Sequence, residues 1–253
     1  MSKRTDVHTT LDRLLDELAF RFMREQYRPL AEEAARQGWD GLDYLCRLVE
    51  GEAAARLDRS VKRRIRLARF PVIKTLDDFD WTWPAKLNRV QVQQLFRLDF
   101  LRTHANVIFL GGVGLGKSHL SSALGYAACL QGFSVRFATA IDIVNGLAAA
   151  QAANALKKEL RKYTRPQLLV IDELGYLPID RLGADLLFQV ISQRYEHGSI
   201  VLNSNKVYKH WPEIFHNDSV LATAVLDRLL HHADTVTITG KSYRMKDQQQ
   251  PET

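Results

Sequence analysis

The sequence has little cysteine and no long apolar run. The two cysteines among 253 residues, Cys46 and Cys129, stand too far apart for a metal-ligand spacing or a disulfide framework. Each lies in an apolar helical pattern, so we expect two buried thiols in a reducing compartment. No stretch approaches the roughly 20 apolar residues that a membrane span needs, and the N-terminus has no signal-peptide core. These absences favour a soluble, cytoplasmic protein.

Composition indicates a folded chain of ordinary polarity. Hydrophobic residues make up 46% and charged residues 25%, which excludes global disorder. The length is sufficient for one large α/β domain and a smaller appendage. The net charge of +6 fits a nucleic-acid partner but does not require one, so the positions of the charges must decide.

The first 75 residues show helical spacing of apolar side chains and no strand pattern. We expect a small helical domain there, assigned to binding DNA or a partner protein. Its helices are predicted at 11–22, capped by Thr10; at 29–37, closed by Gly38; and from Leu42 to Arg69, ended by Phe70-Pro71.

From residue 76 the pattern changes to strands alternating with helices. An aromatic linker and a helix at 88–103 come first. Five short apolar strands with helical crossovers predict a parallel sheet covered on both faces. A P-loop domain is thus expected at 76–246 and a disordered tail at 247–253. The strands are predicted at 106–111, 134–139, 167–173, 199–205 and 234–240, with helices ending near Gln131 and at 140–163, 182–197 and 219–232.

A complete phosphate-binding loop joins the first predicted strand to the next helix. Its glycines let backbone N–H groups curl around phosphate oxygens, and the helix directs its positive end at the same oxygens. Lys117 would reach the β- and γ-phosphates of ATP, and the Ser118 hydroxyl would bind Mg²⁺. The nucleotide-binding residues are predicted to be Gly111, Gly112, Val113, Gly114, Leu115, Gly116, Lys117, Ser118 and His119.

Two acidic residues end the third predicted strand, directly after four apolar residues. We expect this strand to lie beside the P-loop strand, with its acids facing the metal. Asp172 is placed to hold Mg²⁺ through water, and Glu173 to orient and deprotonate an attacking water.

Polar residues at two further positions complete the predicted catalytic set. Asn205 at the end of the fourth strand would position water beside the γ-phosphate, with Asn203 as the second choice; turn formation is the alternative for both. Arg228 would act in a neighbouring subunit's site as an arginine finger, unless it is a surface residue paired with Asp227. The adjacent histidines that follow, 231 and 232, are interpreted as structural.

Several runs of residues carry a family resemblance. The P-loop with Asp172, Glu173, Asn205 and Arg228 resembles an AAA+ ATPase. The chain is similar to the IstB family, ATPase helpers of insertion-sequence transposition that are related to the DnaC helicase loaders. The resemblance implies ATP-driven assembly of a ring or spiral on DNA, ATP at subunit interfaces, and a transposase partner. The runs are GKSHLSSALG, LLVIDELGYLP, LLFQVISQRYE, SNKVYKHW and DRLLHHADTVTITGKSYRMK.

Two features depart from the wider pattern. The loop reads GGVGLGKS where relatives often read GPPGTGKT, but the glycines, lysine and hydroxyl remain. Only 13 residues follow Gly240, so a full C-terminal helical lid is not expected, and Arg244 is the candidate to replace the lid arginine.

Basic residues gather in two helical segments. Leu57, Val61, Ile65 and Ala68 would face inward on the first, which turns most of its cations outward. Neither segment has a base-reading pattern, so we expect salt-sensitive contact with double-stranded DNA of weak sequence selectivity. The alternative is a solvated face. The candidate DNA contacts are Arg59, Lys62, Arg63 and Arg66, within a run that also holds Arg56, Arg64 and Arg69, and then Lys157, Lys158, Arg161 and Lys162, followed by Arg165.

Three functions compete at this point. The first is a DNA-stimulated ATPase that assembles on target DNA and regulates a transposase. The second is a DnaC-like loader of a replicative helicase. A small-molecule kinase is the third, and it is disfavoured because Glu173 beside Asp172 suits water activation. The linker aromatics Phe79 and Trp81 are expected in the core, with packing on adenine as the alternative.

Overall fold

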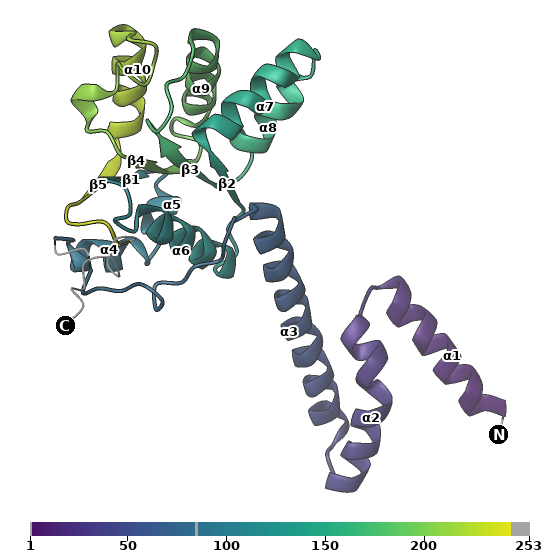
Figure 1. Cartoon of the computed structure of the whole chain (residues 1–253). Helices are drawn as coiled ribbons and strands as arrows, with labels where there is room; N and C mark the ends of the chain where they lie inside the picture. Colours follow the sequence, from purple (N-terminus) through teal and green to yellow (C-terminus); the bar gives the residue numbers. More distant parts are fainter. Residues whose placement is uncertain (1, 84–85, 244–253) are drawn as a thin grey trace, which may run out of the picture. The chain divides into compact units, whose positions relative to one another are not determined.

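The computed structural model describes residues 2–83 and 86–243 (Figure 1). Contacts divide the chain into two compact units, one ending at Arg63 and the other beginning at Arg64, so the division falls within helix α3, Gly41–Ala68. The assignment of a DNA- or partner-binding domain to residues 1–75 stays a prediction. Arg244 and the tail predicted at 247–253 lie outside the described residues. No helix in the described ranges has the length and apolarity to cross a membrane.

The first unit consists of helices. They are α1 (Ser2–Glu17), α2 (Arg21–Gln37) and most of α3. Thr10 lies inside α1, so its predicted capping role is wrong; the chain instead breaks at Ala19, whose φ is 54°. Pro29 lies inside α2 rather than at its start. Side-chain packing around Tyr27 supports α2 despite the backbone hydrogen bond that a proline removes.

Helix ends in this unit follow local chemistry. Gly38, with φ of 70°, closes α2 and donates its N–H to the Ala34 carbonyl, as predicted. At the other end of α2, the buried carboxylate of Glu52 accepts the N–H groups of Phe22 and Met23 at 2.8 and 3.3 Å. Cys46 is exposed, so the expectation of two buried thiols holds for Cys129 alone.

The second unit is built on a five-stranded parallel sheet, as predicted. Its strand order is β2-β3-β4-β1-β5. The order corrects one expectation: β3, which carries the two acids, does not lie beside the P-loop strand β1, because β4 separates them. The strands are β1 (Asn106–Gly111), β2 (Val135–Thr139), β3 (Leu168–Leu174), β4 (Ser199–Ser204) and β5 (Ala233–Ile238).

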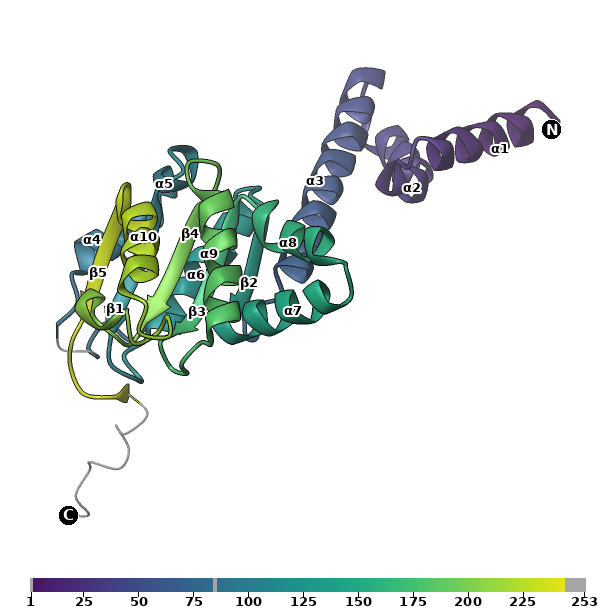
Figure 2. The same ribbon diagram turned by 90° about the horizontal axis from the view of Figure 1, so that it is seen from above.

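Helices cover both faces of this sheet (Figure 2). One core is packed beneath α4 (Arg89–Leu95), α5 (Asp99–Arg102) and α6 (Lys117–Leu130). The other lies beneath α7 (Ala140–Ala152), α8 (Leu156–Thr164), α9 (Arg181–Arg194) and α10 (Ser219–Leu230). A short 3-10 helix, Tyr208–His210, follows β4.

Two predicted helices are each divided in two. The helix expected at 88–103 breaks before α5 at Leu98, and the helix expected at 140–163 breaks between α7 and α8 at Asn154. Both residues have left-handed backbone angles, with φ of 62° and 55°. A residue in that region cannot continue a right-handed helix, whatever the spacing of the apolar side chains around it.

Candidate functional site

The phosphate-binding loop lies at the carboxyl end of β1 and opens into α6. Gly116 has φ of 86°, and a β-carbon there would meet the Phe79 ring at 2.7 Å, so the position requires glycine for two reasons. Lys117 is buried and donates from Nζ to the carbonyls of Gly111 and Gly112 at 2.7 and 2.6 Å. Ser118 is exposed in the first turn of α6, where the helix dipole favours an anion.

A cavity of about 340 Å³ lies against this loop. It lies within the range of about 300–1,000 Å³ that is usual for small-molecule sites. The ring of Phe79 packs edge-on to His119 and to Trp81, with centroids 5.3 and 5.0 Å apart. Phe79 is buried in the core and also lines the cavity, whereas Trp81 is half-buried. The cavity is lined by Lys74, Asp78, Phe79, Asp80, Trp83, Gly114–His119, Tyr176 and Tyr243.

The segments on either side of the loop are fastened to it by hydrogen bonds. The His119 Nε2 pairs with the carbonyl of Thr75 at 2.8 Å. Beyond β5, the N–H of Tyr243 donates to the carbonyl of Gly114 at 2.8 Å. A β-carbon at Gly114, whose φ is 74°, would lie 2.0 Å from the Ser242 hydroxyl oxygen. The loop therefore has the residues before α4 on one side and those after β5 on the other.

Asp172 and Glu173 occupy different environments at the end of β3. Asp172 is buried, and its Oδ1 accepts the Glu173 N–H at 2.8 Å. Glu173 is exposed, has φ of 61°, and lies where the pairing with β4 shifts register. A bulge of this kind redirects a side chain. Here it separates a carboxylate held inside the protein from a neighbouring carboxylate open to solvent.

Asn203 connects the strand that carries the acids to the helix that follows the loop. It is fully buried on β4, and its Nδ2 donates to Asp172 Oδ1 and to the Ser121 hydroxyl, both at 2.8 Å. Asn205, the first choice from the sequence, is half-buried just beyond β4. The sequence pattern did not predict that Asn203 fixes Asp172. The signal for this role was a polar residue directly after the apolar run of β4.

The donor set fits a hydrated Mg²⁺ ion. Asp172 supplies a carboxylate and Ser118 a hydroxyl, which are oxygen ligands of the type that Mg²⁺ prefers. The Oδ1 atoms of Asn203 and Asn205 are buried and have no hydrogen-bond partner among the described residues. Buried oxygens of this kind are usually paired, so they provide acceptors for bound water at this end of the sheet.

Arg228 lies near the end of α10, just before β5 begins, and therefore at the opposite end of the strands from the loop, which follows β1. Six residues of β1 separate the two edges, a rise of roughly 16–20 Å. Its guanidinium stacks on the Phe188 ring, 4.7 Å from the centroid, and donates to the Ala224 carbonyl at 2.9 Å. No ion pair joins it to Asp227 within the described ranges. Arg228 is therefore remote from its own P-loop.

The first basic segment, on α3, is partly neutralised. Arg59 contacts the buried Glu52 at 2.8 Å, and Lys62 contacts Asp58 at 2.8 Å, while Arg63 and Arg66 are exposed. Burial alone would raise the pKa of Glu52, but hydrogen bonds from Arg59, Arg56 and two backbone N–H groups hold that pKa below its ordinary value.

The inward face predicted for this segment is only partly correct. Ala68 is buried and Ile65 packs against the core, but Leu57 is 62% exposed. Helical spacing identified a stripe along α3, yet burial needs a packed neighbour as well as the right period. The stripe meets the core of the second unit only in the last turns of the helix.

The second basic segment is α8, an amphipathic helix. Leu160 and Tyr163 form its buried face, and its basic residues are exposed. Lys162 pairs with Glu159 at 2.5 Å. The exposed cations are Lys157, Lys158, Arg161, Lys162 and Arg165.

Comparisons with known proteins agree with this architecture. The chain matches the family described as IstB-like ATP binding protein over residues 13–251. It is 41% identical over 225 residues to an ATP-binding protein of insertion sequence IS5376 from Geobacillus stearothermophilus, covering 89% of each chain. It is 39% identical over 237 residues to that of insertion sequence IS21 from Pseudomonas aeruginosa, covering 94% of this chain and 89% of the other.

Solved structures of low identity share the fold of about two thirds of this chain. AMPPCP-bound DnaA from Aquifex aeolicus matches with a TM-score of 0.56 at 20% identity, covering 71% of this chain and 54% of that one. DnaI matches with a TM-score of 0.57 at 16% identity, covering 69% and 93%. The family match spans nearly the whole sequence and the relatives are similar along most of their length. The chain thus belongs to the IstB-like ATP-binding protein family and has an AAA+ fold.

Proposed function

We propose that this chain is an ATP-dependent, DNA-binding helper of insertion-sequence transposition, which assembles on target DNA with ATP, hydrolyses it, and regulates a partner transposase. The observation that carries the proposal is a complete phosphate loop together with a buried aspartate and an exposed glutamate on β3, where Asn203 links the aspartate to the helix that follows the loop. The names of the relatives support the transposition setting, because they are ATP-binding proteins of insertion sequences.

Each residue of the loop has a separate task in this scheme. The loop N–H groups and the start of α6 bind the phosphates of ATP, and the Lys117 ammonium neutralises charge on the β- and γ-phosphates. Ser118 and Asp172 would hold Mg²⁺, which supplies charge stabilisation for the transferred phosphoryl group. Asn203 keeps Asp172 in place through its 2.8 Å hydrogen bond.

Glu173 is the proposed general base. Its exposed carboxylate accepts a proton from the attacking water, while Asn205 hydrogen-bonds the same water and orients it. The proton passes to the carboxylate oxygen as the water oxygen bonds to the γ-phosphorus and the bond to ADP breaks. The bulge at Glu173 gives this carboxylate a direction different from that of Asp172.

Two substitutions test the hydrolysis scheme. Lys117→Ala is expected to abolish ATP binding, measured with a fluorescent ATP analogue. Glu173→Gln is expected to keep binding within a few-fold and lower turnover by at least about 100-fold, as loss of a general base does. Glu213→Gln, an exposed carboxylate elsewhere on the same unit, is the control and keeps wild-type turnover. Full activity in Glu173→Gln would remove this residue from the catalytic role.

Arg228 is proposed to complete the site of a neighbouring subunit as an arginine finger. Its distance from its own loop and its place near the end of α10 support this role. Arg228→Ala and Lys117→Ala should each be inactive alone, with losses of about 10³-fold or more expected for a finger. Mixing them restores interfaces that pair an intact loop with an intact finger. Absence of any recovery across mixing ratios contradicts the shared site.

DNA contact is proposed for both basic segments and is tested best on α8. Lys158 and Arg161 are exposed, and neither belongs to an ion pair among the described residues. Replacing both with alanine should weaken duplex binding for every sequence and reduce the slope of log affinity against log salt by about two. Lys209→Ala, an exposed lysine outside the segment, is the control. An unchanged salt slope contradicts contact by α8.

The identity of the partner protein is tested by comparing a transposase with a replicative helicase. Under the proposal, the transposase of the same element responds to this chain in the presence of ATP and DNA, whereas a replicative helicase does not. Measuring strand transfer by the transposase and loading of the helicase in parallel separates the two. A response by the helicase alone would favour the loader function.

A further inference from the structure

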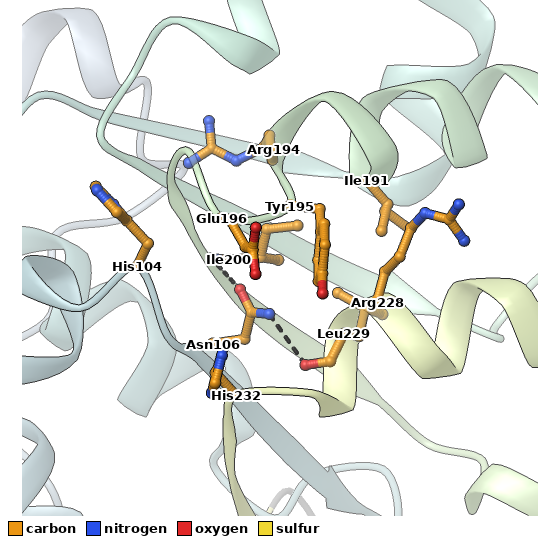
Figure 3. Close-up of a pocket in the computed structure, with 10 residues that line it drawn as sticks. All are labelled: His104, Asn106, Ile191, Arg194, Tyr195, Glu196, Ile200, Arg228, Leu229 and His232. Carbon is orange, nitrogen blue, oxygen red and sulfur yellow. Dashed lines mark hydrogen bonds between the residues drawn. The ribbon is translucent and has the colours of Figure 1, made fainter.

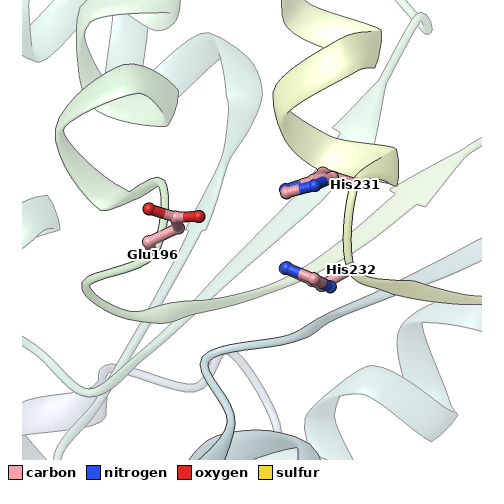
Figure 4. Close-up of side chains that lie close together, drawn as sticks. All are labelled: Glu196, His231 and His232. Carbon is pink, nitrogen blue, oxygen red and sulfur yellow. The ribbon is translucent and has the colours of Figure 1, made fainter.

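Three potential metal ligands gather at the edge of the sheet opposite the P-loop (Figure 4). Glu196 lies in the turn between α9 and β4, and His231 and His232 lie between α10 and β5. One ligand atom from each residue lies within 4.8 Å of the others, and all three side chains are exposed. The sequence interpretation treated the two histidines as structural and did not connect them with Glu196.

A buried asparagine fixes the backbone on both sides of this cluster (Figure 3). Asn106 donates from Nδ2 to the Leu229 carbonyl at 3.0 Å, and its Oδ1 accepts the Ile200 N–H at 2.9 Å. Its own N–H donates to the His232 carbonyl at 2.7 Å. The end of α10 and the start of β4 are therefore tied to one residue, which holds together the backbone segments that flank the histidines and follow Glu196.

A buried arginine fixes the turn that carries Glu196. Arg194 is 1% exposed, and its guanidinium donates to the Ser199 carbonyl at 2.7 Å and to the Tyr163 and Pro166 carbonyls at 2.8 Å. Between Arg194 and Ser199 the chain makes a tight turn, in which Glu196 has φ of 60°. The Glu196 side chain lies across from the two histidine rings (Figure 4).

Tyr195 supplies the outer contact that metal-binding histidines usually have. Its hydroxyl lies 2.8 Å from His231 Nδ1, which leaves Nε2 of the same ring available as a ligand. The rings of His231 and His232 lie close together, with centroids 4.1 Å apart.

We propose that Glu196, His231 and His232 form a zinc site, with the fourth coordination position open. Two imidazoles and one carboxylate are a donor set suited to Zn²⁺, whereas Ca²⁺ and Mg²⁺ prefer oxygen ligands alone. Ligands about 2.0–2.2 Å from zinc lie roughly 3.3–3.6 Å apart in a tetrahedron, so the side chains must approach by about 1 Å. Exposed side chains make that movement by small rotations, while the clamped backbone stays in place.

The surroundings have room for a fourth ligand, and the Arg228 guanidinium is turned away from them. A cavity of about 10 Å³, lined by Glu196 and His232 among others, has space for roughly one water molecule. Arg228 lines the same cavity, but its guanidinium is turned away from Glu196 and stacks on Phe188 (Figure 3). The proposed zinc ligands therefore lie at the opposite end of the strands from this chain's own P-loop.

The test uses the full-length, tag-free chain after chelation and dialysis. Titration with Co²⁺ should give visible absorption bands of a tetrahedral site at one equivalent, and Zn²⁺ should displace the Co²⁺. Glu196→Gln, His231→Ala and His232→Ala should each weaken binding by more than tenfold. Tyr195→Phe should weaken it by about 10- to 100-fold, as outer-contact substitutions do.

The control is His210→Ala, which removes an exposed histidine paired with one carboxylate, Glu213, at 2.8 Å. This variant should bind as the wild type does. The proposal is overturned if Co²⁺ and Zn²⁺ bind the wild type no more tightly than they bind Glu196→Gln, or if His210→Ala loses as much affinity as the ligand variants. Circular dichroism of each variant verifies folding, and the exposed, isosteric Glu196→Gln carries the test if a histidine variant fails to fold.

Discussion

Replacing Asn203 with aspartate should make the stability of the fold strongly dependent on pH. The amide nitrogen lies 2.8 Å from Asp172 Oδ1 in a fully buried position. In the variant Asn203→Asp an oxygen takes the place of this donor. Two carboxylate charges at that distance repel by about 6 kcal/mol at an effective dielectric constant of 20, so one proton is retained instead. Keeping it costs about 1.4 kcal/mol per pH unit above the ordinary aspartate pKa of about 3.9.

The expected loss of unfolding free energy is therefore about 4 kcal/mol at pH 7 and about 1.5 kcal/mol at pH 5. The folded variant binds one more proton than the unfolded chain, so its stability falls as the pH rises from the unfolded pKa toward the raised pKa of the buried pair. Urea denaturation followed by circular dichroism measures the loss at both pH values.

Asn203→Leu is the control, because it removes both hydrogen bonds of the Asn203 amide nitrogen and adds no titrating group. Its loss of stability relative to wild type should change less between pH 5 and pH 7 than the loss in Asn203→Asp. The reasoning is refuted if Asn203→Asp and Asn203→Leu differ by the same amount at the two pH values, since the amide would then not face the Asp172 carboxylate.

Two further substitutions and one labelling experiment test other parts of the structure. Gly111→Ala places a β-carbon 2.3 Å from the Ile238 carbonyl oxygen, and we expect a loss of about 1–3 kcal/mol in thermal or urea denaturation; unchanged stability would mean that β1 and β5 are less close. Arg194→Lys should cost about 3 kcal/mol, because an ammonium cannot reach the same set of carbonyls, and a neutral result would contradict the clamp. Burial raises the pKa of Cys129 to about 11, so iodoacetamide at pH 8 should label the exposed Cys46 first and Cys129 only after unfolding, as mass spectrometry of digests will show.

The sheet and the loop were predictable because their signals are local. Each strand is a short apolar run, and the P-loop fixes its own backbone through glycine. Strand order was not predictable in this way: the sequence places Asp172 at a strand end, but only packing puts β4 between that strand and β1. For the same reason the sequence ranked Asn205 above Asn203, although the latter contacts Asp172.

The helical spacing of apolar residues also could not predict the helix breaks or the long-range polar contacts. Leu98 and Asn154 adopt left-handed angles within segments whose apolar spacing is continuous, so the period predicts one helix where there are two. Asn106, Arg194 and Glu196 act across turns and strands that are distant in the sequence. Their partners are set by the topology of the sheet, which a pattern of neighbouring residues does not contain.

The left-handed backbone at Glu173 has a consequence for engineering. A residue other than glycine in this conformation costs about 1–2 kcal/mol, and glycine or asparagine would avoid most of it. A library of variants selected only for thermal stability should therefore become enriched in Glu173→Gly and Glu173→Asn. Both lack the carboxylate proposed as the base, so selection for a more stable fold would select against turnover. Under the proposed role of Glu173, stability and turnover place opposite demands on this position, so selection for heat resistance alone would choose variants with lower activity.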